Sequence, residues 1–193
     1  FLPTVEEVYP QGINAPPPAL DFGQLDKVME GAMRPGHFAG VAQVVQRLLA
    51  LTLPDRLYMG QKDYQQVAIV QSMIEQRQIP VEFVIVATVR ERDGLALSSR
   101  NVRLQPELRK KAPEIFRLMQ LAKGEVLAGT PPTKAASRAV ETLEEIDGFK
   151  VEYVEIFDGK SLQPVTDASA ESIVIALAVW AGEVRLIDNL IIR

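Results

Sequence analysis

Gly60, Lys62 and Asp63 stand together where an apolar run, residues 56–59, gives way to an amphipathic one. A glycine lets a ligand approach the backbone, free N–H groups at the start of a helix favour an anion, and a lysine supplies a point charge suited to phosphate. The pattern predicts a phosphate-binding turn. The alternative is that Asp63 is only the N-cap of the helix and Lys62 is a solvated surface residue. This alternative stays open because the motif is short.

A second segment with the same chemistry is GLALSSRN, residues 94–101. Ser98 and Ser99 offer two hydroxyl donors, and Arg100 adds a planar guanidinium that matches phosphate oxygens. The alternative is a loop that only caps the helix expected from residue 106. Two phosphate-type loops where two lobes meet are typical of a nucleotide-dependent transferase with a moving lid, so the two segments strengthen each other.

Other residues with chemical potential are fewer. Arg34 and His37, the only histidine, lie around a Pro-Gly turn. Because a helix is expected to begin there, a capping or structural role for His37 is favoured over a catalytic one. Three aromatic residues, Tyr153, Phe157 and Trp180, follow strand patterns and are expected in the core.

The elements around the Lys62 segment predict a βαβ unit. Apolar side chains occur at helical spacing in residues 37–55, where Pro54 is expected to stop the helix, and in residues 63–78. Residues 56–59 and 81–86 are apolar runs that predict buried strands. Such strands are typical of a parallel sheet covered on both faces. Two strands are too few for that sheet, so we expect that the chain begins partway through a larger protein. Residues 1–24 are rich in proline and predict an ordered surface loop or a linker.

The pattern changes between residues 87 and 92, where we place a domain boundary. Helices are predicted over 106–123 and 133–145, and a half-buried strand over 149–158. Residues 172–192 predict two antiparallel strands joined at Ala181-Gly182-Glu183. Helices followed by an antiparallel sheet indicate a separate α+β lobe.

Composition excludes several classes of function. The 193 residues are 47% hydrophobic and 24% charged, with a net charge of −4, so no general basic field attracts nucleic acid or an anionic membrane. No apolar run approaches the ~18 residues of a membrane-spanning helix. The chain has no cysteine, which excludes disulfides and is compatible with the cytoplasm. With one histidine, a site built on a histidine pair is impossible within this sequence.

Three stretches together resemble the pantothenate synthetase (pantoate–β-alanine ligase) family: EGAMRPGHFAGV at 30–41, YMGQKDYQQ at 58–66 and TVRERDGLALSSRN at 88–101. They occur in the family's order and at fitting separations, and the resemblance covers essentially the whole chain. It implies an α/β fold: a partial Rossmann-like nucleotidylyltransferase domain with a parallel sheet at 1–88, followed by a small α+β lid domain with an antiparallel sheet at 89–193.

The resemblance also implies an activity. It is the ATP-dependent joining of pantoate to β-alanine through a pantoyl-adenylate, with release of AMP and pyrophosphate and with Mg²⁺ as a cofactor. By the resemblance, the ATP-binding residues are Gly60, Gln61, Lys62, Asp63, Val89, Leu97, Ser98, Ser99 and Arg100, with Val89 contacting adenine through its backbone. The catalytic residues among them are Lys62, Ser98, Ser99 and Arg100. The pantoate-binding residues are Gln66, Val44 and Val45.

Catalysis of this kind is mostly alignment and stabilisation of spreading negative charge by cations, which agrees with the residue types found. No residue of this chain is predicted as a metal ligand. A hinge near residues 87–92 would let the second lobe close over the site and exclude water. The family resemblance also suggests a homodimer through the larger domain.

The sequence departs from the family in one respect. The family's amino-terminal M-G-x-L-H-x-G-H signature, whose histidines bind ATP phosphates, is not present. We therefore expect this chain to be the carboxyl-terminal portion of such an enzyme and to be inactive alone. Two alternatives stay open: an adenine-nucleotide-binding or dimerisation module without its own catalysis, and a nucleotidylyltransferase that transfers AMP to a phosphorylated acceptor. Gln66, Val44 and Val45 suit a small hydroxy acid better than such an acceptor.

Overall fold

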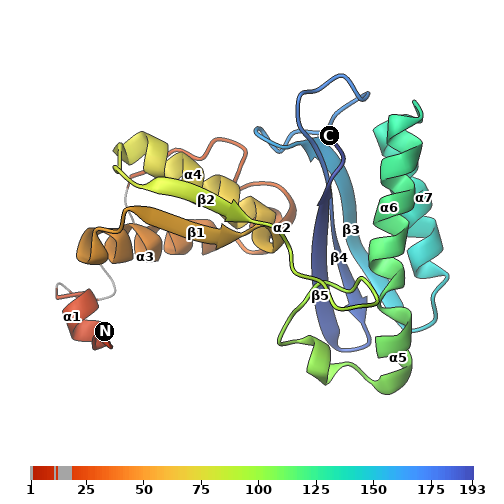
Figure 1. Cartoon of the computed structure of the whole chain (residues 1–193), viewed down its shortest axis with the longest axis horizontal. Coiled ribbons are helices and arrows are strands. Elements are labelled where there is room, and N and C mark those ends of the chain that lie inside the picture. Colours follow the sequence, from red (N-terminus) through yellow and green to blue (C-terminus); the bar gives the residue numbers. More distant parts are fainter. Residues whose placement is uncertain (1, 11, 13–18) are drawn as a thin grey trace. The chain divides into compact units, whose positions relative to one another are not determined.

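The computed structural model describes residues 2–10, 12 and 19–193, so the expected loop at the proline run 16–18 lies outside the described residues. The chain forms two compact units, coloured in Figure 1 from red to yellow-green and, apart from the short segment Gln61–Asp63, from green to blue. The first unit comprises Phe1–Gly60 and Tyr64–Val86, and the second comprises Gln61–Asp63 and Ala87–Arg193. In the part of the chain that the structure describes, every helix is too short or too polar to cross a membrane.

The first unit contains the predicted βαβ arrangement. Strands β1 and β2 pair in parallel, from Arg56 opposite Glu82 to Gly60 opposite Val86, and α4 connects them. The parallel βαβ prediction is therefore confirmed. The elements of this unit are α1 Val5–Val8, α2 Met29–Met33, α3 His37–Thr52, β1 Arg56–Gly60, α4 Tyr64–Arg77 and β2 Glu82–Val86.

Helices α3 and α4 build the core of this unit. As expected from the helical spacing, α4 buries Val67, Val70 and Ile74. Phe38 and Leu49 of α3 are buried in the same unit. Helix α3 ends at Thr52, two residues before the proline predicted to stop it, since proline cannot continue a helix.

The prediction that β1 and β2 are buried on both faces is wrong. Leu57, Met59 and Phe83 pack against the cluster formed by α3 and α4. Tyr58 points to the other face and is 59% exposed. The side chains alternate because successive residues of a strand point to opposite faces, and the described helices cover only one of those faces.

The second unit is an antiparallel sheet with helices on one face (Figure 1). The strand order is β3-β4-β5, with an irregularity in register between Val151 and Tyr153. The predicted hairpin turn is confirmed: Gly182 has φ 61°, which favours glycine. The elements are α5 Pro106–Lys111, α6 Glu114–Leu127, α7 Pro132–Glu144, β3 Phe149–Asp158, β4 Ile173–Ala181 and β5 Val184–Ile191, with short 3₁₀ turns η1 at Gln61–Asp63 and η2 at Asn101–Arg103.

Two expectations for this unit need correction. The single helix predicted over 106–123 is two helices, α5 and α6, because Pro113 has no N–H to donate to the helical ladder. Trp180 is 37% exposed rather than buried, and its indole N–H donates to Glu152 Oε2 at 3.2 Å. Phe157, by contrast, is buried as expected.

The packing of α7 against the sheet generates a stability prediction. Leu143 is fully buried in the core of the second unit. Leu143→Ala removes this side chain and leaves a cavity, so we expect a loss of about 2–5 kcal/mol in the free energy of unfolding, measured by urea denaturation. Val102 is 88% exposed, and Val102→Ala is the control, with a change below about 0.5 kcal/mol. Equal effects of the two changes would contradict this account of the core.

Candidate functional site

The Lys62 turn is the 3₁₀ segment η1, which runs directly into α4 at Tyr64. Gly60 precedes the turn as its cap, and Asp63 is the last residue of the turn, directly before α4. Gly60 has φ −73°, an ordinary value, and a Cβ built on it would meet nothing within 4 Å. Neither a tight turn nor close packing therefore requires glycine at this position.

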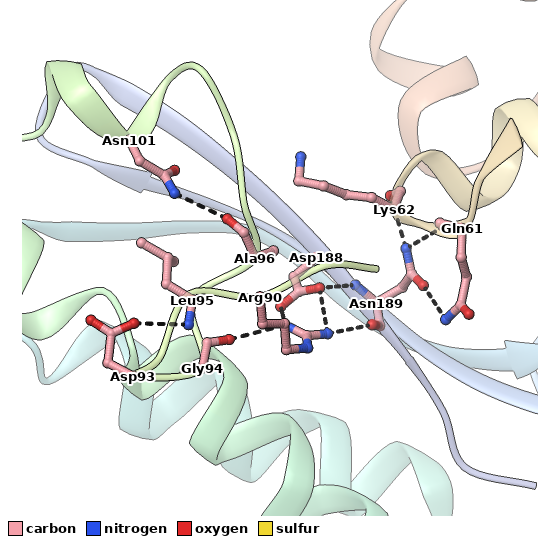
Figure 2. Close-up of polar contacts among 10 residues, drawn as sticks. All are labelled: Gln61, Lys62, Arg90, Asp93, Gly94, Leu95, Ala96, Asn101, Asp188 and Asn189. Atoms are coloured by element: carbon pink, nitrogen blue, oxygen red, sulfur yellow. Dashed lines mark hydrogen bonds and ion pairs between the residues drawn. The ribbon is translucent and has the colours of Figure 1, made fainter. Parts of the chain in front are cut away.

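Asn189 of β5 holds this turn in place (Figure 2). Its amide Nδ2 donates to the carbonyl oxygens of Gln61 and Lys62, at 2.9 and 2.8 Å. Gln61 Nε2 in turn donates to Asn189 Oδ1 at 3.1 Å. Because Asn189 is only 1% exposed, water does not compete well for these groups, and the backbone of the turn is fixed.

An ion pair lies next to Asn189. Arg90 donates to both carboxylate oxygens of Asp188, at 2.6 and 3.0 Å, and also to the carbonyl oxygens of Asn189 and Gly94. Its guanidinium lies 3.8 Å from the centre of the Phe116 ring. Burial raises the pKa of the Asp188 carboxyl, and the hydrogen bonds and charge of Arg90 oppose that effect.

Arg90 also begins the segment that carries Ser98, Ser99 and Arg100. The segment turns back at Gly94, whose φ of 95° favours glycine, and Arg90 bridges to Ala96. At the far end, Asn101 Nδ2 donates to the carbonyl of Ala96 at 3.0 Å and to Glu91 Oε1 at 2.7 Å. The second predicted segment is therefore an ordered loop rather than a simple cap for α5.

This loop, the Lys62 turn and β5 line one pocket of the second unit. Lys62, Ser98 and Arg100, from the two predicted segments, all line it, with Asp188 and Arg185 from β5. The backbone N–H of Arg100 donates to Ser98 Oγ at 3.2 Å. Ser99 is exposed and is not among the residues that line the pocket. The arrangement places cations and a hydroxyl on one cavity, which suits a phosphate group.

Two apolar residues predicted at the nucleotide lie together outside this pocket. The carbonyl of Val89 accepts from the N–H of Leu97 at 2.9 Å. Their side chains are 62% and 57% exposed. The structure thus brings these two positions side by side, with apolar surface open to solvent.

The residues predicted to bind pantoate lie in the first unit. Val44 of α3 is exposed, Val45 packs against the core, and Gln66 of α4 is half-buried. Its neighbour Gln65 is buried and donates to the carbonyl oxygens of residues 25 and 28, which is a structural role.

His37, also in the first unit, is the first residue of α3. Burial lowers the pKa of its imidazole, and the nearby charge of Arg34 lowers it further. Among the described residues, no group of three or more histidine, cysteine or carboxylate side chains is arranged to hold a metal ion.

Sequence reasoning missed the residues that hold the pocket together: Arg90, Asn101, Asp188 and Asn189. Asp188 and Asn189 did leave a signal, since they are adjacent polar residues in an otherwise apolar stretch, LIDNLII. Arg90 and Asn101 stand in a polar segment, where nothing distinguishes a buried side chain from a solvated one.

Fold and pocket together define a class: an α/β unit of the nucleotidylyltransferase type followed by an α+β lid-like unit. The family model for pantoate-beta-alanine ligase matches residues 1–191. The chain belongs to the pantoate-beta-alanine ligase family.

Similar proteins extend this finding. The chain is 46% identical to pantothenate synthetase of Porphyromonas gingivalis, covering 98% of this chain and 66% of that protein. A crystal structure of pantothenate synthetase from Thermus thermophilus matches with a TM-score of 0.88 and 44% identity, covering 98% of this chain and 68% of that one. A Francisella tularensis pantoate-beta-alanine ligase complexed with beta-gamma ATP and beta-alanine matches with a TM-score of 0.70 and 29% identity, covering 97% and 62%. The chain thus spans about two thirds of the length of its relatives.

The turn at Gly94 generates a prediction. A Cβ at Gly94 would lie 2.8 Å from Phe116 Cδ1, and φ of 95° strains any other residue. We expect Gly94→Ala to lower the free energy of unfolding by about 1–3 kcal/mol. Gly124 lies inside α6 with nothing within 4 Å, so Gly124→Ala is the matched control and is expected to be neutral or stabilising. Thermal denaturation of both variants checks this, and a tolerated Gly94→Ala would show that the loop is not held as described.

A second prediction concerns acid pH. Arg109 pairs with Glu91 and Asp93, each at 2.6 Å. The pKa of Glu91 is lowered first by its hydrogen bond from Asn101 and then by Arg109, and that of Asp93 is lowered first by Arg109. Lowered folded pKa values mean that these carboxylates stabilise the loop above their ordinary values of 4.5 and 3.8, and that this contribution is lost as pH falls through the folded values.

We therefore expect amide hydrogen exchange in residues 91–101, corrected for its intrinsic pH dependence, to show less protection as pH falls from about 5 to about 3. Arg109→Gln is the control: its loop should already be less protected at a pH of about 6 and should lose less on acidification. Identical pH profiles for the two proteins would contradict a role of these ion pairs.

Proposed function

We propose that this chain contributes to the ATP-dependent condensation of pantoate with β-alanine, which yields pantothenate, AMP and pyrophosphate through a pantoyl-adenylate. Membership of the family and the Francisella tularensis relative complexed with beta-gamma ATP and beta-alanine support the proposal. The observation that carries it is the convergence of Lys62, Ser98 and Arg100 on one pocket.

The chemistry suits those residues. In the first step a pantoate carboxylate oxygen bonds to the α-phosphorus, and the bond from that phosphorus to the bridging oxygen of pyrophosphate breaks. Negative charge spreads over the phosphate oxygens, where Lys62 and Arg100 stabilise it and the hydroxyls of Ser98 and Ser99 donate. The carboxylate is already ionised, so this step needs alignment more than a protein base.

In the second step the β-alanine amine attacks the acyl carbon of the adenylate, and AMP leaves. Water competes for the same carbon, so a closing second unit with a hinge near residues 87–92 would favour the amine. Mg²⁺ would arrive on the nucleotide phosphates, which is its usual manner of binding in such sites, and would neutralise part of their charge.

The remaining predicted residues have proposed roles in binding. Gln66, Val44 and Val45 bind pantoate, the backbone of Val89 contacts the adenine, and Leu97 belongs to the second ATP-binding segment. The open space beside Gly60 supports close approach of a nucleotide to the backbone of residues 60–63, because no folding constraint explains the glycine.

We further propose that the chain is the carboxyl-terminal portion of the enzyme, with domains at 1–88 and 89–193, and is inactive alone. It spans 66% of the Porphyromonas relative. Cytoplasmic location and homodimer formation are the family's expected properties; the absence of cysteine is compatible with a reducing compartment. A nucleotide-binding module that pairs with a separate chain is the second candidate, favoured by the same partial coverage.

The test is Lys62→Ala, with MgATP binding measured by isothermal titration calorimetry. Loss of one charge-assisted contact, about 1.5–3 kcal/mol, should weaken binding by about 10- to 100-fold. Lys110 is largely exposed on α5, away from the pocket, and Lys110→Ala is the control for removal of a positive charge. Equal affinities of the two variants would contradict the phosphate site.

The activity of the isolated chain distinguishes a portion of the enzyme from a nucleotide-binding module. We expect no measurable pantothenate formation from pantoate, β-alanine and ATP by this chain alone. We expect pantothenate to form when the third of a relative that this chain does not match is added as a second polypeptide. Turnover by the chain alone would overturn the proposal that it is inactive without a second polypeptide. ATP binding without turnover in either mixture would favour the module.

A further inference from the structure

We propose that Asn189 is a positioning residue of the phosphate site: it acts through Lys62 by fixing the backbone from which that lysine extends. The inference rests on the proposed function, because it assigns Asn189 to the same pocket. Asn189 itself is 1% exposed and does not line the pocket, so it does not act by touching a ligand.

The hydrogen bonds of the Asn189 side chain are all directed at the turn. An amide group has two N–H donors, and here both are used, one on the carbonyl of Gln61 and one on the carbonyl of Lys62. The amide oxygen accepts from Gln61 Nε2. This pattern fixes two consecutive peptide groups at once. Figure 2 shows the Lys62 side chain extending away from Asn189.

Fixing the peptide matters because lysine is a flexible residue. Its ammonium group is a compact charge on a four-carbon stem, and each freely rotating bond lowers the fraction of time that the charge spends at the ligand. When the carbonyl of Lys62 is held, the backbone of the turn does not move. Only rotations within the lysine side chain can then displace its charge from the ligand. The contribution of Asn189 is thus preorganisation of a cation rather than an additional contact.

The surroundings hold Asn189 in a single orientation. Its backbone N–H donates to Asp188 Oδ1 at 2.8 Å, and its carbonyl accepts from Arg90 at 3.2 Å. Arg90 also donates to the carbonyl of Gly94, at the turn of the loop that carries Ser98 and Arg100. The same arginine therefore fixes the strand behind the Lys62 turn and the loop that carries the second cation of the pocket.

The experiment is a double-mutant cycle on MgATP affinity with Lys62→Ala, Asn189→Leu and the combination. Leucine has nearly the branched shape of asparagine, adds no charge and removes every side-chain hydrogen bond to the turn. We expect Asn189→Leu to raise the Kd for MgATP about tenfold, and to have no further effect in the Lys62→Ala background. Leu143→Ala, which lowers stability through the core of the second unit, is the control and should bind MgATP like the unaltered chain.

The outcomes separate this inference from the proposed function. Unaltered affinity in Asn189→Leu, with weak binding in Lys62→Ala, would overturn the positioning role and leave the phosphate site standing. Effects that add fully in the double variant, or an equal loss in Leu143→Ala, would show that Asn189 acts on stability and not through Lys62. Failure of the unaltered chain to bind MgATP would overturn the phosphate site and this inference with it.

Discussion

The buried ion pair between Arg90 and Asp188 is the interaction on which the pocket depends. Asp188 is 4% exposed, and a carboxylate removed from water is costly unless a cation and hydrogen bonds compensate for the lost solvation. Arg90 meets that need with two hydrogen bonds. If Arg90 moved away, the buried carboxylate of Asp188 would lose its compensating charge and hydrogen bonds. The segment that begins at Arg90 therefore stays against β5. The orientation of Asn189, and through it the Lys62 turn, follows from that constraint.

The sheet makes this constraint possible. Successive residues of β5 point to opposite faces, so Asp188 meets Arg90 on one side while Asn189 meets the Lys62 turn on the other. Helices α6 and α7 hold the strands through a core that includes Leu143 and Leu177. The proposed reaction would depend on alignment and cations, and it would need such a frame more than acids and bases with unusual pKa values.

Much of the fold could be predicted because its signals are local. The helical spacing in α4, the parallel βαβ unit and the hairpin at Gly182 depend on residues close together in the chain. The errors at Tyr58 and Trp180 have one cause: the burial of a side chain is decided by its neighbours in the fold. The strand at Tyr58 looks buried from composition, yet its exposure depends on which face the helices cover. The break at Pro113 could be predicted from the proline itself, but the apolar periodicity on both sides of it favoured a single helix.

The sequence by itself determined the family and the residue types at the proposed phosphate site, because Lys62, Ser98 and Arg100 lie in short stretches that carry their own chemistry. Only the tertiary structure decided which residues hold them. Asn189 contacts a turn 127 residues away, and Asp188 pairs with an arginine 98 residues away. No local pattern encodes such partners, since whether a polar side chain is buried and paired depends on strands and loops that meet only when the chain has folded.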